Sequence, residues 1–567
     1  MSFSRLTKRD WVFVETLPIL LWLISDRWMF LPVQYWFDPW GCLGVYLNYE
    51  YLSSLHQSSY CIARLPSIIP HFFAYKFLSS YWAVVITTLL KFYLCIIPLY
   101  WSLFEITKNR LASLIPIFLL SFFPYFLSSL GWNYVDGFGI AYISLATAFF
   151  IAACTKENWK VWLLLAGFFQ ALMVFNYLFV VVFAAIQVAI FIAYNQANEQ
   201  KPLFVCALFL GLGALLGTAC LSSFSYYFNG TIFFFWPQIQ AAIHLSSLAH
   251  FASGKDSVWY LPFKEWFPRS TFLFLTGLSF FLSVPYLLER LKIFKASPIS
   301  IFNLPSLIVI QFLMAVLIYI IQDFLGIHML QNFFVASYLL PFAVLALGVV
   351  LSEKMIMIRH QSWIIYGILG TLYIVFAFKG NAAVVGRSWG CVIVHFIGCA
   401  IFSLLLLKAS KRSHKIIFSV LAGLCIVLAF SRLTTSNNHY PYKDHSDNKL
   451  LINLHRYIKK DIPSENSYLF WYNIETDPLS SFFQPLACTY LGTLFSNKFP
   501  EIHEDDFLEK SKSTIILLSS DPGAAEKAQK ALRQKGYDWD ILKQEKFQLD
   551  QKEFWLLAFL LKPICEE

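Results

Sequence analysis

Charged residues are scarce in this chain, and their scarcity indicates the class of protein. Only 14% of the 567 residues are Asp, Glu, Lys or Arg, whereas an ordinary soluble domain has about 25%. So little charge cannot cover a water-facing surface of this size. Glycine and proline are also few, at 24 and 23 residues, which excludes collagen-like and disordered chains. Because 58% of the residues are hydrophobic, we expect an α-helical polytopic membrane protein.

Several motifs with known chemistry are missing as well. The 11 cysteines include no CxxC pair, which argues against a zinc ribbon or a dithiol redox site. The sequence also lacks the P-loop of nucleotide-driven pumps and the HExxH and GxSxG motifs of hydrolases. The net charge of +9 is distributed among loops between apolar segments, so we expect no nucleic-acid partner.

The apolar segments predict about 13 transmembrane helices, since one span needs about 20 apolar residues. One long segment, residues 161–194, is interrupted only at Asn176–Tyr177. Within another, Gly213 and Gly217 have the spacing of a helix-packing notch. The predicted spans are residues 11–31, 82–104, 111–130, 137–154, 161–175, 178–194, 203–222, 272–288, 303–321, 330–351, 362–379, 390–407 and 414–431.

The distribution of basic residues predicts the orientation. Lys108, Lys156, Lys201 and similar residues gather in the loops on the side of the N-terminus, and the positive-inside rule places that side in the cytoplasm. We read the first span as a retained signal-anchor. An odd number of spans then puts the C-terminal region outside, and we expect a bacterial inner-membrane protein with this region in the periplasm.

Two domains are expected. Residues 1–431 form the transmembrane domain, with long outer loops at residues 32–81 and 223–271. Beyond residue 431 the charges become dense, and short apolar runs such as 468–474, 514–519 and 554–561 alternate with helical stretches such as 524–535. This alternation is typical of α/β folds, so residues 432–567 are predicted to be a small extracytoplasmic α/β domain.

Two isolated acidic residues are the first candidates for a functional site. Asp38 follows the first span in an aromatic segment, and Asp136 lies in the short outer turn before the fourth span. Acidic groups at membrane depth are costly and usually functional, and partial desolvation would suit Asp38 to act as a general base. The alternatives are an Asp-Pro turn at Asp38 and an N-cap at Asp136. Together the two acids could hold a divalent metal ion if a substrate phosphate joined them.

Basic residues are the complementary candidates. Arg64 and Arg387 lie near the outer interface, and Lys91 lies well inside the second span. Arginine grips phosphate through paired hydrogen bonds and lysine acts as a point charge, so all three could bind a phosphate group. The alternative for the two arginines is contact with lipid headgroups. Lys91 fits a buried ion pair as well as a phosphate ligand.

These features together resemble the GT-C superfamily of integral-membrane glycosyltransferases, especially protein O-mannosyltransferases and the aminoarabinose transferase acting on lipid A. The resemblance rests on an acid just after the first span, a second acid before the fourth and an outer C-terminal domain. It also rests on the stretch Tyr338-Leu339-Leu340-Pro341, which opens a late span.

The resemblance implies sugar transfer from a polyprenyl-phosphate donor to a lipid, glycan or protein acceptor at the outer face. Asp38 is then the candidate base and Asp136 a second catalytic residue, with Arg64, Lys91 and Arg387 binding the departing phosphate. Glu50, in the first outer loop, and Tyr338 are the further candidates for contact with substrate. The main alternative is a lipid-linked-sugar flippase or another polytopic transporter, which would place its charged groups near the bilayer midplane.

Overall fold

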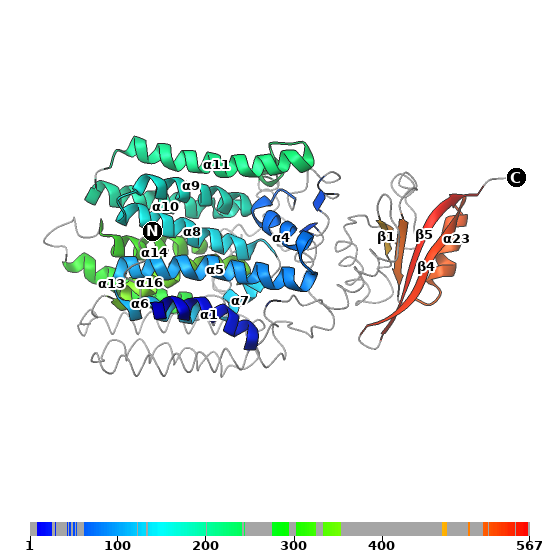
Figure 1. Cartoon of the computed structure of the whole chain (residues 1–567), viewed down its shortest axis with the longest axis horizontal. Coiled ribbons are helices and arrows are strands. Elements are labelled where there is room, and N and C mark those ends of the chain that lie inside the picture. The colour runs from blue at the N-terminus through cyan, green and yellow to red at the C-terminus, as the bar shows by residue number, and fades with distance from the viewer. Residues whose placement is uncertain are drawn as a thin grey trace. The chain divides into compact units, whose positions relative to one another are not determined.

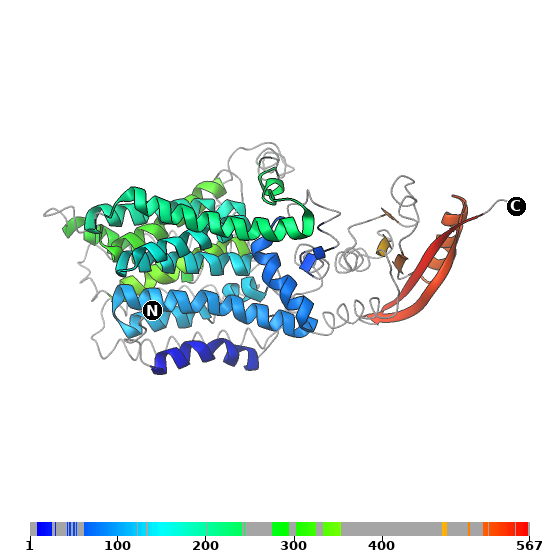
Figure 2. The same cartoon turned by 45° about the horizontal axis from the view of Figure 1, so that its top comes forward.

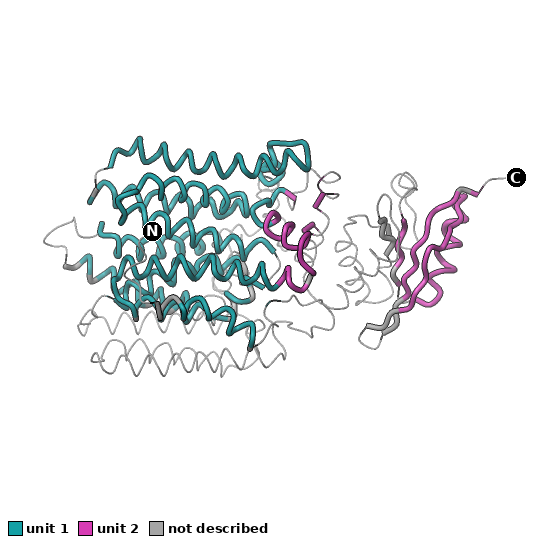
Figure 3. The backbone as a smooth tube through the Cα atoms, in the orientation of Figure 1, with its two compact units in different colours: residues 1–29, 63–67, 85–440 teal, residues 30–62, 68–84, 441–567 magenta. Residues whose placement is uncertain are grey.

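The computed structural model describes part of the chain, in two compact units (Figure 3). Unit 1 comprises residues 1–29, 63–67 and 85–440, and unit 2 comprises residues 30–62, 68–84 and 441–567. The described residues are 8–24, 29, 42, 45, 46, 49, 50, 53, 62–121, 123–131, 134–199, 201–240, 243, 275–293, 302–324, 333–352, 468–472, 497–498, 514–519, 521–549 and 552–564.

Unit 1 is helical, and its long helices run roughly parallel to one another (Figures 1 and 2). The first of the described helices are α1 (Lys8–Ile24), α4 (Leu65–Phe77), α5 (Ser80–Thr107), α6 (Arg110–Ser121), α7 (Pro124–Gly131) and α8 (Asp136–Thr155). They are followed by α9 (Trp159–Asn176), η2 (Leu178–Val180), α10 (Val181–Tyr194), η3 (Asn195–Glu199), α11 (Leu203–Asn229), α13 (Leu275–Ile293), α14 (Leu304–Phe324), α15 (Phe333–Ala336), η6 (Ser337–Leu339) and α16 (Leu340–Ser352).

Six of the described helices are long and apolar enough to cross a membrane, which confirms the predicted class. The predicted break between the fifth and sixth spans is also confirmed. Helix α9 ends at Asn176, and Tyr177 has extended backbone angles (φ −155°, ψ 110°). The predicted spans 362–379, 390–407 and 414–431 lie outside the described residues, and so does the predicted domain boundary at residue 431. The count of about 13 spans therefore stays a prediction.

The predicted span 111–130 is not one helix. It is divided into α6, which ends at Ser121, and α7, which begins at Pro124. Proline has no N–H group and its ring clashes with the carbonyl group four residues earlier, so it fits the first position of a new helix better than a helix interior. The apolar pattern across this segment gave no sign of the division.

Helices α9 and α11 approach closely through glycines, as the spacing of Gly213 and Gly217 predicted. A Cβ atom added at Gly213 would lie 2.9 Å from the backbone nitrogen of Phe168, and one added at Gly167 would lie 3.0 Å from that of Ala214. Both positions therefore let the two backbones touch. Gly211, two residues from Gly213, faces open space.

Buried amide side chains join three helices in the middle of the bundle. The Gln187 Nε2 atom of α10 donates to Thr147 Oγ1 of α8 at 2.7 Å, and the Gln170 Nε2 atom of α9 donates to Gln187 Oε1 at 3.0 Å. Gln170 also donates to the Ala184 carbonyl group at 3.3 Å. No water competes for these groups inside a bilayer, so such bonds help hold the helices in register.

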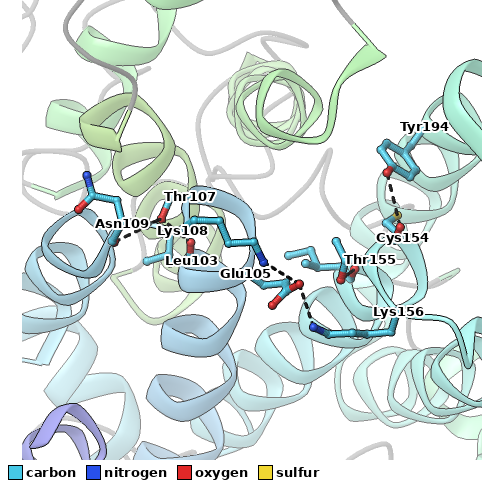
Figure 4. Close-up of polar contacts among 10 residues, drawn as sticks. Leu103, Glu105, Thr107, Lys108, Asn109, Cys154, Thr155, Lys156 and Tyr194 are labelled. Carbon is cyan, nitrogen blue, oxygen red and sulfur yellow. Dashed lines mark hydrogen bonds and ion pairs between the residues drawn. The ribbon is translucent and has the colours of Figure 1, made fainter. Parts of the chain in front are cut away.

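Basic residues lie near the end of α8 at Thr155 (Figure 4). Lys108 and Lys156 both pair with Glu105 Oε1 at 2.8 Å, and Lys201 Nζ donates to the Ala153 carbonyl group at 2.9 Å. Because α8 has 20 residues, its two ends are separated by about 30 Å. Lys108, Lys156 and Lys201, which the sequence analysis placed on a common inner side, therefore share one end of the bundle.

The C-terminal part of unit 2 is a mixed sheet covered by one helix. The strands are β1 (Tyr468–Tyr472), β2 (Asn497–Lys498), β3 (Thr514–Ser519), β4 (Tyr537–Leu549) and β5 (Lys552–Pro563), in the order β2-β1-β3-β5-β4. Strand β1 is parallel to β2 and β3, whereas β5 is antiparallel to β3 and β4. Alternate residues of β5, such as Leu557 and Phe559, pack with Ala528 and Leu532 of α23 (Ala524–Arg533). The predicted α/β character of this region is confirmed.

The glycine contact between α9 and α11 predicts a selective loss of stability. We expect Gly213→Ala to lower the free energy of unfolding by about 1–3 kcal/mol, because the new methyl group has no room against the backbone of α9. Gly211→Ala is the matched control, and better helix propensity should leave it neutral or slightly stabilised. Thermal unfolding of both variants in detergent measures the difference. Equal melting temperatures for the two variants would contradict the contact.

Candidate functional site

The first turn of α8 holds the central acidic residue. Helix α8 begins at Asp136, and its N-cap position is Val135, whose side chain cannot accept a hydrogen bond. The alternative interpretation of Asp136 as the N-cap is therefore wrong. Asp136 is fully buried and lies in the first helical turn, where the exposed N–H groups of the backbone favour negative charge.

Lys91 of α5 is buried near the same turn. Its side chain is 1% exposed, and it lies near enough to Asp136 for an electrostatic interaction between the two groups. A Cβ atom added at Gly137 would lie 2.6 Å from Lys91 Cδ, so the lack of a side chain there gives the lysine stem its path. The Lys91 ammonium group also lies 5.7 Å from the centre of the Phe138 ring. Lys91 and Asp136 thus lie in one buried site, and the two roles predicted for Lys91, as an ion-pair partner and as a phosphate ligand, both stay predictions.

Tyr338 approaches the same turn from η6. Its ring and its hydroxyl group lie against Gly139, where an added Cβ atom would lie 2.6 Å from Tyr338 Cε1. Ser337 next to it is hydrogen-bonded to Ser129 of α7 at 2.8 Å. The glycines at positions 137 and 139 therefore make room for Lys91 and Tyr338 at the first turn of α8, which begins with Asp136.

Arg64 lies at the start of α4, between two aromatic rings. Its guanidinium carbon is 4.8 Å from the centre of the Tyr134 ring and 4.6 Å from that of the Tyr177 ring. The side chain is 2% exposed, so Arg64 does not reach out to lipid headgroups as a snorkelling arginine would. Stacking on tyrosine faces leaves the guanidinium edge as the part that donates hydrogen bonds.

The Tyr177 ring connects Arg64 to Tyr338. Its centre lies 6.4 Å from that of the Tyr338 ring, and the Phe179 ring lies 5.2 Å from Tyr338 on the same side. From the sequence, Asn176–Tyr177 was interpreted only as a break between spans. The signal that could have placed the two residues beside Arg64 and Tyr338 was a polar residue followed by tyrosine inside a long apolar segment.

The other predicted site residues are placed differently. Glu50 is exposed and belongs to unit 2, where its Oε1 atom pairs with Lys76 Nζ at 2.7 Å. Asp38 and Arg387 lie outside the described residues. In the part of the chain that the structure describes, no group of three or more His, Cys, Asp or Glu residues could hold a metal ion. Asp38 lies outside this part, so the hypothesis that Asp38 and Asp136 could hold a divalent metal ion with a substrate phosphate is not tested.

The apolar helices of unit 1 define a polytopic membrane protein, whose C-terminal part is a small α/β sheet. The chain is similar to the solved structure of ArnT from Cupriavidus metallidurans bound to undecaprenyl phosphate, with a TM-score of 0.53. The match covers 97% of this chain and 98% of that one at 13% identity. The apo structure of the same protein matches with a TM-score of 0.43 and 12% identity over 97% of both chains. No protein-family model and no curated protein sequence matches the chain.

The buried pair predicts coupled effects on stability. If Lys91 compensates the Asp136 charge, we expect Lys91→Met to lower the free energy of unfolding by about 3 kcal/mol or more, the usual cost of removing one partner of a buried ion pair. The double variant Lys91→Met/Asp136→Asn should recover most of this loss, since neither charge remains. Thermal unfolding of the single and double variants measures the coupling. Losses that simply add would show that the two charges act independently.

Proposed function

We propose that the protein is a membrane glycosyltransferase that moves a sugar from a polyprenyl-phosphate donor to a lipid, glycan or protein acceptor. The observation that carries this proposal is the buried site of Lys91, Asp136, Tyr338 and Arg64 within a fold similar to that of ArnT. That protein was solved with undecaprenyl phosphate, which is the lipid phosphate that such a transfer releases. A pair of buried cations is suited to bind the same group.

The orientation proposed from the sequence places this site at the outer face. Asp136 begins α8, and Lys156 follows the end of the helix, where it pairs with Glu105. Basic residues favour the cytoplasmic side, so the Asp136 end is proposed to face the periplasm of a bacterial inner membrane. The donor and the acceptor would then meet at the outer surface.

The proposed reaction is a direct displacement that inverts the anomeric carbon. The acceptor hydroxyl oxygen forms the new bond, its proton passes to the Asp38 carboxylate, and the bond from the anomeric carbon to the phosphate oxygen breaks. Lys91 and Arg64, with Arg387, would stabilise the negative charge that develops on the departing phosphate. Asp136 is fully buried in the first turn of α8, so its proposed role is to orient the reacting groups while Asp38 removes the proton.

A lipid-linked-sugar flippase is the alternative, because it would bind the same lipid phosphate. Charged groups of transporters typically lie at the bilayer midplane. Here Asp136 is the first residue of its helix, and Arg64 immediately precedes α4. Placement of both residues at helix ends supports transfer at one face rather than passage across the membrane.

Asp38→Asn tests the reaction directly. The full-length protein in lipid vesicles is incubated with a panel of radiolabelled polyprenyl-phosphate sugars and cell-envelope lipids. We expect the wild-type protein to consume one donor, and Asp38→Asn to reduce this rate at least about 100-fold, which is the typical contribution of a general base. Asp540→Asn is the control, since Asp540 is 53% exposed and pairs with Lys562 in the C-terminal sheet.

The outcomes separate the two functions. Wild-type rates in folded Asp38→Asn protein would remove Asp38 as the base. Consumption of no donor, together with movement of a labelled lipid across the vesicle, would establish the flippase instead.

Chelation tests the metal requirement. We expect transfer to continue in excess EDTA, because the Lys91 ammonium group already provides positive charge beside Asp136 and Arg64 supplies a second cation. The same radiolabel assay measures the rate before and after chelation. A loss of activity that Mg²⁺ or Mn²⁺ restores would instead support a metal ion between Asp38, Asp136 and the donor phosphate.

A further inference from the structure

Asn176 ties together two segments that lie far apart in the sequence. It is fully buried at the end of α9, and its Nδ2 atom donates to the Val135 carbonyl group at 2.8 Å. Its Oδ1 atom accepts a short hydrogen bond from Ser67 Oγ. Ser67 Oγ also lies 3.3 Å from the Val135 carbonyl oxygen. Both the amide nitrogen and the amide oxygen of the Asn176 side chain are thus hydrogen-bonded within the bundle.

Each of the two segments carries a charged group of the site. Val135 precedes Asp136, and its carbonyl group accepts the N–H of Gly139 at 3.0 Å, the first bond of α8. Ser67 lies one turn after Arg64, and its N–H donates to the Arg64 carbonyl group at 3.1 Å. Asn176 therefore joins the turn that presents Arg64 to the turn that presents Asp136.

Two further hydrogen bonds reinforce the same junction. Gln238 Nε2 donates to the carbonyl groups of Ala63 at 2.9 Å and Phe175 at 2.8 Å, so it ties the residue before Arg64 to the residue before Asn176. The Tyr142 hydroxyl group donates to the Pro66 carbonyl group at 2.7 Å. The residues on both sides of Arg64 are thus held by side chains from α8 and from the segment after α11.

We propose that Asn176 is a positioning residue of the lipid-phosphate site. By holding the Arg64 turn against the first turn of α8, it fixes the guanidinium group relative to the Lys91–Asp136 pair, so that one lipid phosphate meets both cations. The next residue, Tyr177, stacks on Arg64 and lies near Tyr338. The residues between α9 and α10 are therefore part of the proposed site. This inference rests on the proposed function.

Gln170 provides a matched control in the same helix. It is also a buried amide that bonds to a neighbouring helix, through Gln187 and the Ala184 carbonyl group. Its network reaches α8 at Thr147, which lies three turns from Asp136. A variant at Gln170 therefore loses a similar set of hydrogen bonds without disturbing the Arg64 turn.

The test measures binding of undecaprenyl phosphate to the purified full-length protein in detergent. We expect Asn176→Ala to weaken binding about tenfold, the equivalent of losing one buried hydrogen bond that orients a charged ligand group, and Gln170→Ala to bind as the wild type does. Ser67→Ala removes a smaller part of the same junction and should weaken binding in the same direction. Thermal unfolding identifies the folded variants.

A double-mutant cycle with Arg64→Lys separates positioning from general structural support. If Asn176 acts through the guanidinium group, Asn176→Ala in the Arg64→Lys background should weaken binding less than twofold. Lysine has no planar guanidinium group whose orientation Asn176 could fix. The same tenfold loss in both backgrounds, or equal binding by Asn176→Ala and Gln170→Ala, would overturn the inference while leaving the proposed function intact. If the wild-type protein itself does not bind undecaprenyl phosphate, both the proposed function and this inference are wrong.

Discussion

The burial of Lys91 and Asp136 together at the first turn of α8 is the constraint on which the rest of the site depends. An ionised group buried without compensation costs several kcal/mol, so two nearby groups of opposite charge are less costly to bury than either one alone. Glycine at position 137 makes room for the Lys91 side chain, and glycine at position 139 makes room for the Tyr338 ring. In the sequence Asp136-Gly137-Phe138-Gly139, the buried carboxylate is therefore followed by two glycines that leave space for neighbouring side chains.

Hydrogen bonds from the side chains of neighbouring segments then hold the Arg64 turn near these two residues. The Arg64 turn is tied to α8 and to the end of α9 by side chains that are themselves buried. Polar groups inside an apolar bundle must satisfy one another, because water is not available. A network of this kind has few alternative arrangements, so it holds a cation and a carboxylate in fixed positions. Fixed charges are what stabilisation of a departing phosphate requires.

Sequence reasoning was effective where a residue contrasted with its surroundings. Asp136 and Lys91 stand out as charges within apolar segments, and Asn176–Tyr177 stands out as the interruption of a continuous run. Sequence reasoning was less effective for partners, because the pairing of Ser67 with Asn176 joins residues 109 positions apart. The pairing of Glu50 with Lys76 was missed for the same reason. Periodicity describes single helices, whereas such contacts follow from how helices pack against each other.

The central claim is that the buried cations of this site receive a lipid phosphate. A cryo-electron microscopy structure of the full-length protein with undecaprenyl phosphate tests it most directly. The account predicts phosphate density within hydrogen-bonding distance of Lys91 Nζ and the guanidinium edge of Arg64, at the Asp136 end of α8. Density at the opposite end, beside Lys108 and Lys156, with an empty site at Lys91, would contradict it.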